Sequence, residues 1–447
     1  MGKSETILGY LETVEEQIRW KRARPVVLLE LRRHLEDQRD AFFEEGSTPE
    51  EAEQLAVEEM GDPVSVGAEL DRIHRPKPQR GLLGLTVLLA AAGSVLRIWL
   101  TAGWAGLDIS PIKTLTALLL GTVCMLGAYF LDYTWLGRHA IAVYTGAILA
   151  GAAALRWSPS INHASYYTRY VVLCYPVVYA VWLYACRGKQ WRGLAMAILG
   201  VVPLSMIGLL APYLAGALLL WASGLVLLLT AAWNDWFGIG KWKSITLPLM
   251  CAMSMIGYAC WRLFNGYHNS RLSVFLHPEQ DPYGTGYQAL SVRSALSVSR
   301  WLGEGNWSDT AYPYSYEMIV PECRGDFFLT TIIYKLGWLP FLALAVVFAV
   351  LVLWLLGRCL RQMNQLGRMI ALAVVLTLGL QAVCSVGLNM GYVLFSMSFP
   401  LVVGNLHMVL DMALIGLVLS VFRSGSIARD EELGRMRYKY VIVKVPC

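Results

Sequence analysis

Two acids, Glu322 and Asp326, stand where the long polar stretch of this chain ends and an apolar stretch begins at Phe327. The dielectric constant falls sharply at such a boundary, and partial burial raises the pKa of a carboxyl group toward the range that suits a general base. Asp326 is therefore a candidate general base. The residue types alone also fit a second interpretation, in which Asp326 caps the following helix and is stabilised by the helix dipole.

The sequence around these acids predicts a helical membrane protein. The chain has 447 residues, of which 56% are hydrophobic and only 15% are charged. We expect an all-α, polytopic fold with about ten transmembrane helices, because an apolar helix of about 20 residues crosses a bilayer. The expected spans lie near residues 82–101, 114–131, 139–155, 167–186, 193–210, 213–230, 244–263, 327–356, 368–389 and 401–422.

Two places in this list of spans are ambiguous. Only Ala211-Pro212 separates the fifth from the sixth, so the sequence is also compatible with nine spans. The stretch 327–356 is too long for one straight span, and we expect it to tilt or to extend past the membrane.

Basic residues in the short loops predict the orientation. With ten spans, these residues and the basic tail fall on the same side as the N-terminus, which is then cytoplasmic. The residues are Arg187, Lys189, Arg192, Lys241, Lys243, Arg358, Arg361, Arg368, Arg423, Arg429, Arg435, Arg437, Lys439 and Lys444. The loop 265–326 is expected on the outer side of a bacterial plasma membrane, with both termini in the cytoplasm.

Residues 1–75 are more polar than the rest of the chain, and their pattern predicts a small cytoplasmic helical domain. The first 80 residues hold twelve Lys and Arg against eighteen Asp and Glu, a net charge of −6, and they lack the apolar core of a signal peptide. Helical periodicity over 4–22 and 25–45 predicts two apolar faces. These faces comprise Leu8, Leu11, Val14 and Ile18, and Val27, Leu28, Leu31, Leu35 and Phe42.

A capping box from Thr48 to Glu51 predicts a third helix, which stops at Met60-Gly61-Asp62-Pro63, and a fourth helix is expected to run to about Arg72. This pattern resembles the permease prefix (HAAS-type) domain, which implies either a docking or regulatory module or a folding aid at the membrane surface. Residues 76–81 are the expected linker, 82–425 the membrane domain and 426–447 a cytoplasmic tail.

The polar loop carries a second resemblance, to the SEDS family of FtsW, RodA and SpoVE proteins. Pro321, Glu322, Asp326 and Phe327 match the family pattern Pro-Glu-x-x-x-Asp-Phe. Further matches are Arg271, Leu272, Pro278, Asp281, Pro282, Gly284, Tyr287, Gln288, Ala295, Gly303, Gly305 and Gly337. The resemblance implies a peptidoglycan glycosyltransferase that polymerises lipid II, the lipid-linked precursor of the cell wall, in cell shape, division or sporulation.

This resemblance implies roles for individual residues. The family aspartate is required for polymerisation, so Asp326 is expected to accept the proton of the acceptor 4-hydroxyl as it attacks the donor sugar. The departing lipid pyrophosphate needs cations. The expected substrate-binding residues are Arg271, Arg169, Glu322, Gln288 and Arg97. No cofactor is required by the sequence, although the family implies that a divalent cation, Mg²⁺ or Mn²⁺, can assist the pyrophosphate.

Different arguments select Arg97 and Arg169 as substrate-binding residues. Arg169 falls where the family has a lysine at the start of the fourth span. Arg97 lies inside the first span near its outer end, where a charge is costly and is usually functional or paired. Its alternative is to snorkel to the outer interface.

Other family motifs are degraded. His163-Ala-Ser-Tyr166 replaces Gln-Pro-Ser-Glu, and Lys335 replaces a glutamate. The Pro-Phe-x-Ser-Tyr-Gly-Gly turn before the last span is largely lost at 399–404, and Asn405, His407 and Asp411 place polar groups there. These groups are expected to line an internal cavity or to pair across helices, in a divergent member of the family.

The expected partners are lipid II, membrane lipids and a class B penicillin-binding protein, which would supply the transpeptidase. No nucleic acid is expected, since the basic loops are markers of orientation, and no residues have metal-ligand spacing. Two alternatives stay open. The chain could be a transporter (flippase) of a lipid-linked precursor, which need not require Asp326, or a non-catalytic regulatory membrane protein that acts through its N-terminal domain.

Overall fold

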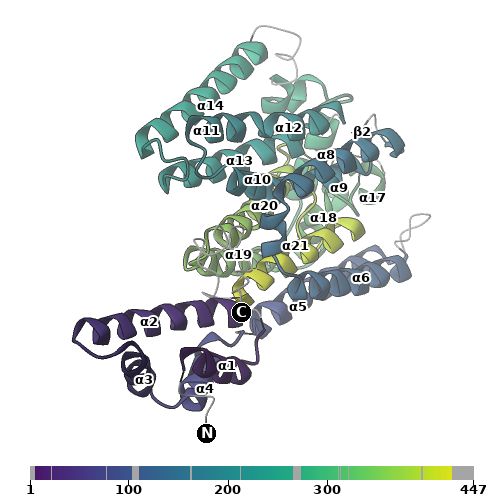
Figure 1. Cartoon of the computed structure of the whole chain (residues 1–447). Helices are drawn as coiled ribbons and strands as arrows, with labels where there is room; N and C mark the ends of the chain where they lie inside the picture. Colours follow the sequence, from purple (N-terminus) through teal and green to yellow (C-terminus); the bar gives the residue numbers. More distant parts are fainter. Residues whose placement is uncertain are drawn as a thin grey trace. The chain divides into compact units, whose positions relative to one another are not determined.

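The computed structural model describes residues 6–21, 23–76, 78–102, 110–161, 164–211, 213–264, 273–310, 312, 314–320, 322–393 and 396–424. The regular secondary structure in this part of the chain is helical (Figure 1), apart from one antiparallel pair, Ser160–Ile161 (β1) with Ala164–Ser165 (β2). The chain divides into two compact units. One contains Met1–Gln79 with Gln362–Gln365 and Phe422–Cys447, and the other contains Arg80–Arg361 with Leu366–Val421.

Four helices form the N-terminal unit, and capping residues set their ends. The helices are α1 (Ile7–Gln17), α2 (Arg24–Glu44), α3 (Pro49–Met60) and α4 (Pro63–His74). The predicted capping box is confirmed, because the Glu51 carboxylate accepts a hydrogen bond from the Thr48 N–H at 3.1 Å and the Thr48 hydroxyl accepts one from the Glu51 N–H. Asp62 caps α4 by accepting a hydrogen bond from the Ser65 N–H at 2.9 Å.

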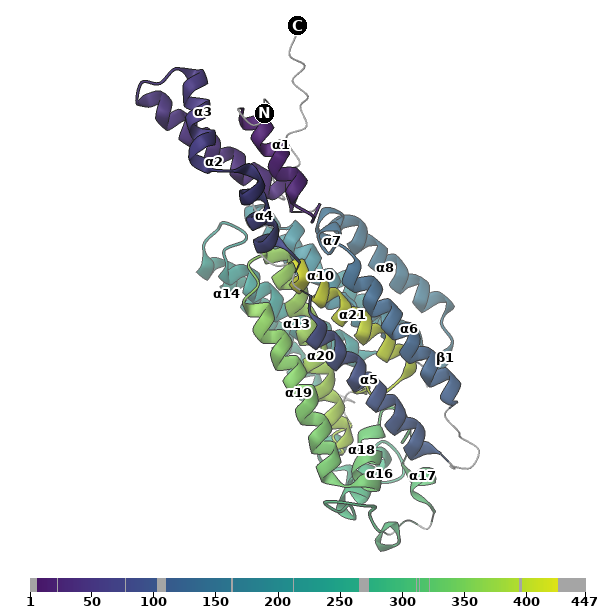
Figure 2. The ribbon, with the colours of Figure 1, turned by 90° about the horizontal axis from the view of Figure 1, so that it is seen from below.

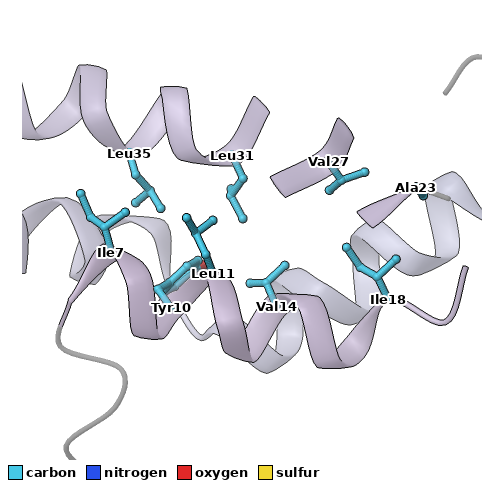
Figure 3. Close-up of a cluster of buried hydrophobic side chains, with 9 residues drawn as sticks. All are labelled: Ile7, Tyr10, Leu11, Val14, Ile18, Ala23, Val27, Leu31 and Leu35. Carbon is cyan, nitrogen blue, oxygen red and sulfur yellow. The ribbon is translucent and has the colours of Figure 1, made fainter. Parts of the chain in front are cut away.

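The core of this unit joins one face of α1 to one face of α2. Figure 3 shows these side chains pointing toward one another, and the predicted residues Leu11, Val14, Ile18, Val27, Leu31 and Leu35 are among them. Leu8, which was predicted on the same face, is 62% exposed, because Ile7 and Tyr10 fill that face instead.

The first helix is shorter than the predicted range 4–22. It ends at Gln17, where Ile18 turns to an extended conformation. The following N–H, of Arg19, donates to the buried carboxylate of Asp71 at 2.9 Å, and this long-range bond replaces the next helical one.

The second unit is a bundle of apolar helices. Within the described residues, eight helices are long and apolar enough to cross a membrane, and one shorter apolar helix accompanies them. In chain order, the α-helices that the structure describes in this unit outside the polar loop, short ones included, are α5 (Arg80–Thr101), α6 (Pro111–Phe130), α7 (Thr134–Arg138), α8 (Ala140–Trp157), α9 (Thr168–Leu173), α10 (Tyr175–Ala185), α11 (Gln190–Leu199), α12 (Val201–Leu210), α13 (Leu214–Trp233), α14 (Lys241–Phe264), α18 (Phe328–Leu336), α19 (Trp338–Leu360), α20 (Gln365–Asn389) and α21 (Asn405–Ser424). The eight of span length are α5, α6, α8, α11 taken together with α12, α13, α19, α20 and α21, and the shorter one is α10. The predicted all-α, polytopic membrane fold is confirmed.

The structure resolves both ambiguous places in the predicted list of spans. The fifth and sixth spans are separate, because α12 ends at Leu210 and α13 begins at Leu214, and these helices pack against each other. The stretch 327–356 is not one tilted helix. It breaks at Gly337 into α18 and α19, where the backbone adopts φ +101° and a Cβ atom would lie 2.5 Å from the Trp301 carbonyl oxygen.

The polar loop is folded onto α18. It contains η1 (Pro278–Gln280), α16 (Tyr287–Ser297), η2 (Trp307–Asp309) and α17 (Tyr316–Ile319). Figure 2 shows α16, α17 and α18 at one end of the bundle. Tyr316 stacks on Tyr334 with ring centroids 4.3 Å apart, and Lys335 forms ion pairs with Glu304 at 2.6 Å and Glu317 at 3.7 Å. The loop is therefore anchored by both an aromatic core and charges.

Replacing Gly337 tests this anchor. We expect Gly337→Ala to lower the free energy of unfolding by about 1–3 kcal/mol, because alanine is strained at this positive φ and its Cβ atom collides with Trp301. The measurement is thermal unfolding of the purified protein in detergent, followed by tryptophan fluorescence.

The matched control is Gly357→Ala, inside α19, where an added Cβ atom meets nothing within 4 Å. This control should be neutral or stabilising by up to about 1 kcal/mol. Equal melting temperatures for both variants would show that the break at Gly337 does not constrain the loop.

Candidate functional site

A cavity of about 590 Å³ lies where the polar loop meets the bundle. It brings together residues that are up to about 310 positions apart in the sequence: Arg97, Ser165, Tyr166, Arg169, Tyr213, Gln288, Glu322, Arg324, Gly325, Asp326, Phe327, Leu388, Val393, Ser396, Met397, Ser398 and His407. Five of the six predicted site residues, Arg97, Arg169, Gln288, Glu322 and Asp326, are among them. The sixth, Arg271, lies outside the described residues.

Asp326 is held by two hydroxyl groups and does not cap a helix. Its Oδ1 accepts a hydrogen bond from Ser398 at 2.6 Å, and its Oδ2 accepts one from Ser396. Its side chain is largely buried. The residue at the N-cap of α18 is Phe327, where no side-chain capping bond is found in the described structure. The capping interpretation is therefore wrong, and the carboxylate faces the cavity.

The backbone at Asp326 is fixed as firmly as its side chain. The Asn389 amide at the end of α20 donates to the Asp326 carbonyl oxygen at 2.9 Å, and the same amide oxygen accepts from the Thr330 N–H at 2.8 Å. Both Asn389 and Thr330 are fully buried. The acid is thus located by three protein segments: the end of the loop, α20 and the residues before α21.

Glu322 begins the turn that ends at Asp326. Its backbone is left-handed, with φ +48°, and its carbonyl oxygen accepts a hydrogen bond from the Gly325 N–H at 2.7 Å. Loss of hydration at the cavity wall, together with the negative charge of Asp326, raises the pKa of the Glu322 carboxyl group, and the charge of Arg169 partly offsets this. The site therefore holds two acids in different environments.

Arg169 supplies a cation that contacts two aromatic rings. Its guanidinium lies 4.5 Å from the ring centroid of Tyr166 and 5.0 Å from that of Tyr170, and it donates to the Tyr170 hydroxyl at 3.0 Å. Its Nε has no hydrogen-bond partner in the described parts of the chain. The aromatic rings orient this arginine and leave donors available to an anion.

Arg97 is tied into the protein and does not snorkel to the interface. From α5, its Nη1 donates to the Asn405 side-chain oxygen at 2.9 Å, and its Nε donates to the Arg324 carbonyl oxygen at 3.3 Å. It therefore joins α5, the turn before α18 and the start of α21. Arg97 lines the cavity, but part of its hydrogen-bonding capacity serves the fold.

Several residues around the cavity were not singled out by sequence reasoning. Arg324 stands inside the recognised motif, between Glu322 and Asp326, so its position could have been noticed. Ser396 and Ser398 carry no signal in the sequence, because they follow α20 in an irregular segment. His407, by contrast, was expected to line an internal cavity or to pair across helices. It lines the cavity, and its ring packs at a tilt against Tyr170 with ring centroids 4.6 Å apart.

Metal-binding groups are sparse. Within the described residues, no group of three or more His, Cys, Asp and Glu side chains is arranged to hold a metal ion. The involvement of Mg²⁺ or Mn²⁺ stays a prediction. Glu322 and Asp326 are the two carboxylates that line the cavity.

Known proteins share both the sequence pattern and the fold. "Probable peptidoglycan glycosyltransferase FtsW" of Halorhodospira halophila is 26% identical over 317 residues, which cover 69% of this chain and 70% of that protein. The protein of the same name from Thioalkalivibrio sp. (strain K90mix) is 31% identical over 172 residues, 36% of this chain and 40% of that protein. A second Thioalkalivibrio relative, from T. sulfidiphilus, is matched over 60% of its length.

Solved structures extend the comparison of folds. One chain of a peptidoglycan synthase complex, described as coordinating polymerization and crosslinking, superposes with a TM-score of 0.60 at 21% identity and covers 77% of this chain and 98% of that chain. The rod shape determining protein RodA of Thermus thermophilus superposes with a TM-score of 0.52 at 18% identity, over 77% of this chain and 96% of that chain.

The family comparison covers most of the chain. The model of the FtsW, RodA and SpoVE family, described as "Cell cycle protein", matches residues 82–426. This range contains every residue that lines the cavity. The chain is therefore a multi-pass membrane protein that belongs to the FtsW/RodA/SpoVE (SEDS) family.

Proposed function

We propose that this protein is a peptidoglycan glycosyltransferase that polymerises lipid II into glycan strands. The observation that carries the proposal is the lining of the cavity, where the fixed carboxylate of Asp326 lies together with the cations Arg97, Arg169 and Arg324. Such a site suits a substrate that has both a hydroxyl group to deprotonate and a pyrophosphate to stabilise. The names of the relatives support the same activity.

Asp326 is the proposed general base. The acceptor 4-hydroxyl attacks the anomeric carbon of the donor strand, so that a C–O bond forms while the bond from that carbon to the lipid pyrophosphate breaks. The hydroxyl proton passes to Asp326, and the pyrophosphate leaves with the bonding electron pair. The hydrogen bonds from Ser396 and Ser398 hold the carboxylate so that its proton-accepting lone pairs are directed before substrate arrives.

The arginines are proposed to stabilise the leaving group. Arg169 keeps a donor free within its aromatic surroundings, and Arg324 also lines the cavity. Arg271, from the family-like loop, and Gln288, at the start of α16, are further proposed substrate contacts. A divalent cation bound to the pyrophosphate would add to this positive charge, with Glu322 and Asp326 as the nearest carboxylates.

The proposed cellular setting follows from the fold. The loop and the cavity would face the outer side of the plasma membrane, with both termini in the cytoplasm, in line with the distribution of basic loop residues. A class B penicillin-binding protein is the proposed partner, since a similar chain occurs in a peptidoglycan synthase complex. The N-terminal unit is proposed as a docking or regulatory module.

Removing the carboxylate charge tests the catalytic role. We expect Asp326→Asn to lower glycan-strand formation from labelled lipid II by roughly 10²- to 10⁴-fold, because the amide cannot accept the hydroxyl proton at neutral pH. The measurement uses purified protein, alone and with candidate class B penicillin-binding proteins. The matched control is Asp309→Asn, an acid of the same loop outside the cavity, which should keep wild-type activity.

Other results would favour other functions. Polymer formation by Asp326→Asn at the wild-type rate would contradict the assignment of the base. Flipping of lipid II in vesicles without polymerisation would support the transporter instead. A requirement for the N-terminal unit in cells, with no requirement for Asp326, would support a regulatory protein.

The pH dependence of substrate binding tests the role of Glu322. Because its pKa is raised, Glu322 stays neutral to a higher pH than a free glutamate, and its ionisation then adds a negative charge beside the pyrophosphate. We expect the KM for lipid II, measured without added divalent cation, to rise as pH increases through a range that lies above the pKa of a free glutamate, about 4.3. Glu322→Gln should abolish that rise. A variant whose KM rises with pH as in the wild type would show that Glu322 does not cause the rise.

A further inference from the structure

We propose that Asp411 is a positioning residue for Asp326: it holds the buried backbone of Leu401 in a left-handed turn, and this turn presents Ser396 and Ser398 to the catalytic carboxylate. The inference rests on the proposed function in assigning the reaction to Asp326. Asp411 does not line the cavity in the described structure, so it cannot act by touching substrate there.

The first step of the argument is the turn itself. Leu401 has φ +64°, a conformation that a bulky side chain rarely adopts, and its side chain is fully buried. The Val403 N–H donates to the Phe399 carbonyl oxygen at 3.2 Å, which closes the turn. Phe399 is buried against Phe348 of α19, with ring centroids 4.8 Å apart. The turn is therefore a compact unit, and Ser398 directly precedes it.

The second step is the bond that stabilises this conformation. The Leu401 N–H donates to Oδ2 of Asp411 at 3.2 Å, and both residues are fully buried. A buried backbone N–H needs a partner, and a left-handed residue inside an apolar bundle has no helical carbonyl to supply one. Asp411, in the second turn of α21, supplies it.

The third step is the cost of this arrangement. Oδ1 of Asp411 has no hydrogen-bond partner among the described residues. An acid inside a membrane bundle costs free energy, so its presence indicates a function. The chain has lost the glycine-rich family turn at 399–404 and retains only Gly404, with φ +81°. An acid that fixes Leu401 from α21 can replace the conformational freedom that the glycines would have provided.

The inference makes Asp411→Ala and Asp411→Asn behave differently. Alanine removes the acceptor for Leu401, so the two serines lose their position and kcat should fall roughly 10- to 100-fold with little change in KM. Asparagine keeps a side-chain oxygen, so kcat should stay within about threefold of wild type. The matched control is Ser420→Ala, which removes a partly buried hydrogen bond from the same helix to the Leu131 carbonyl oxygen and should leave kcat unchanged.

Hydrogen exchange supplies a readout that needs no polymerisation. Amides of residues 396–404 should exchange faster in Asp411→Ala than in wild type, Asp411→Asn or Ser420→Ala, even in a preparation that makes no glycan. If the amides exchange faster in Asp411→Ala but the wild-type protein makes no polymer, the positioning bond is supported and only the proposed function is contradicted. Unchanged exchange in Asp411→Ala would overturn the positioning role.

Two kinetic results would also contradict the positioning role of Asp411. Equal losses of kcat in Asp411→Asn and Asp411→Ala, or a loss confined to KM, would show that the acceptor for Leu401 is not what matters. Should Asp411→Ala fail to give monodisperse protein, Asp411→Val is measured in its place, since valine also removes the acceptor but fills the buried volume with an apolar side chain. A loss of kcat with faster exchange of residues 396–404 in this variant would support the proposal, and wild-type kcat and exchange would overturn it.

Discussion

The site depends on one interaction, the pair of hydrogen bonds from Ser396 and Ser398 to the carboxylate of Asp326. These bonds join the end of the polar loop to the segment before α21, about seventy residues later, and the Asn389 amide fixes the same backbone from α20. A carboxylate that is largely buried, bonded by two hydroxyl groups and attached to a fixed backbone has lost much of its freedom before substrate binds. The arginines and the cavity are useful only if this acid is in place.

Divergence from the family pattern is compensated within the structure. Lys335, at a family glutamate position, pairs with Glu304 and Glu317 of the loop, so in this chain the residue attaches α18 to the loop. Asn405 replaces part of a lost turn and accepts a hydrogen bond from Arg97. The changes therefore affect residues that hold the site in place, such as Lys335 and Asn405, more than they affect the acid and its neighbouring cations.

The sequence predicted the fold well, because apolar stretches of span length and capping residues are local signals. The break at Gly337 was missed, since its cause is the approach of the Trp301 carbonyl from a distant segment. For the site, Asp326, Glu322 and Arg169 could be named from motifs, whereas Ser396 and Ser398 could not. Their role arises from a long-range contact through an irregular segment, and nothing in their own surroundings in the sequence indicates it.

The central claim is that Asp326 meets the acceptor hydroxyl while the arginines meet the pyrophosphate in one cavity. The most direct test is a cryo-electron microscopy structure of the Asp326→Asn variant with lipid II bound. The account predicts a sugar hydroxyl within about 3 Å of the residue 326 side chain and pyrophosphate density beside Arg169. A bound lipid II whose pyrophosphate lies outside this cavity, with no sugar near residue 326, would contradict it.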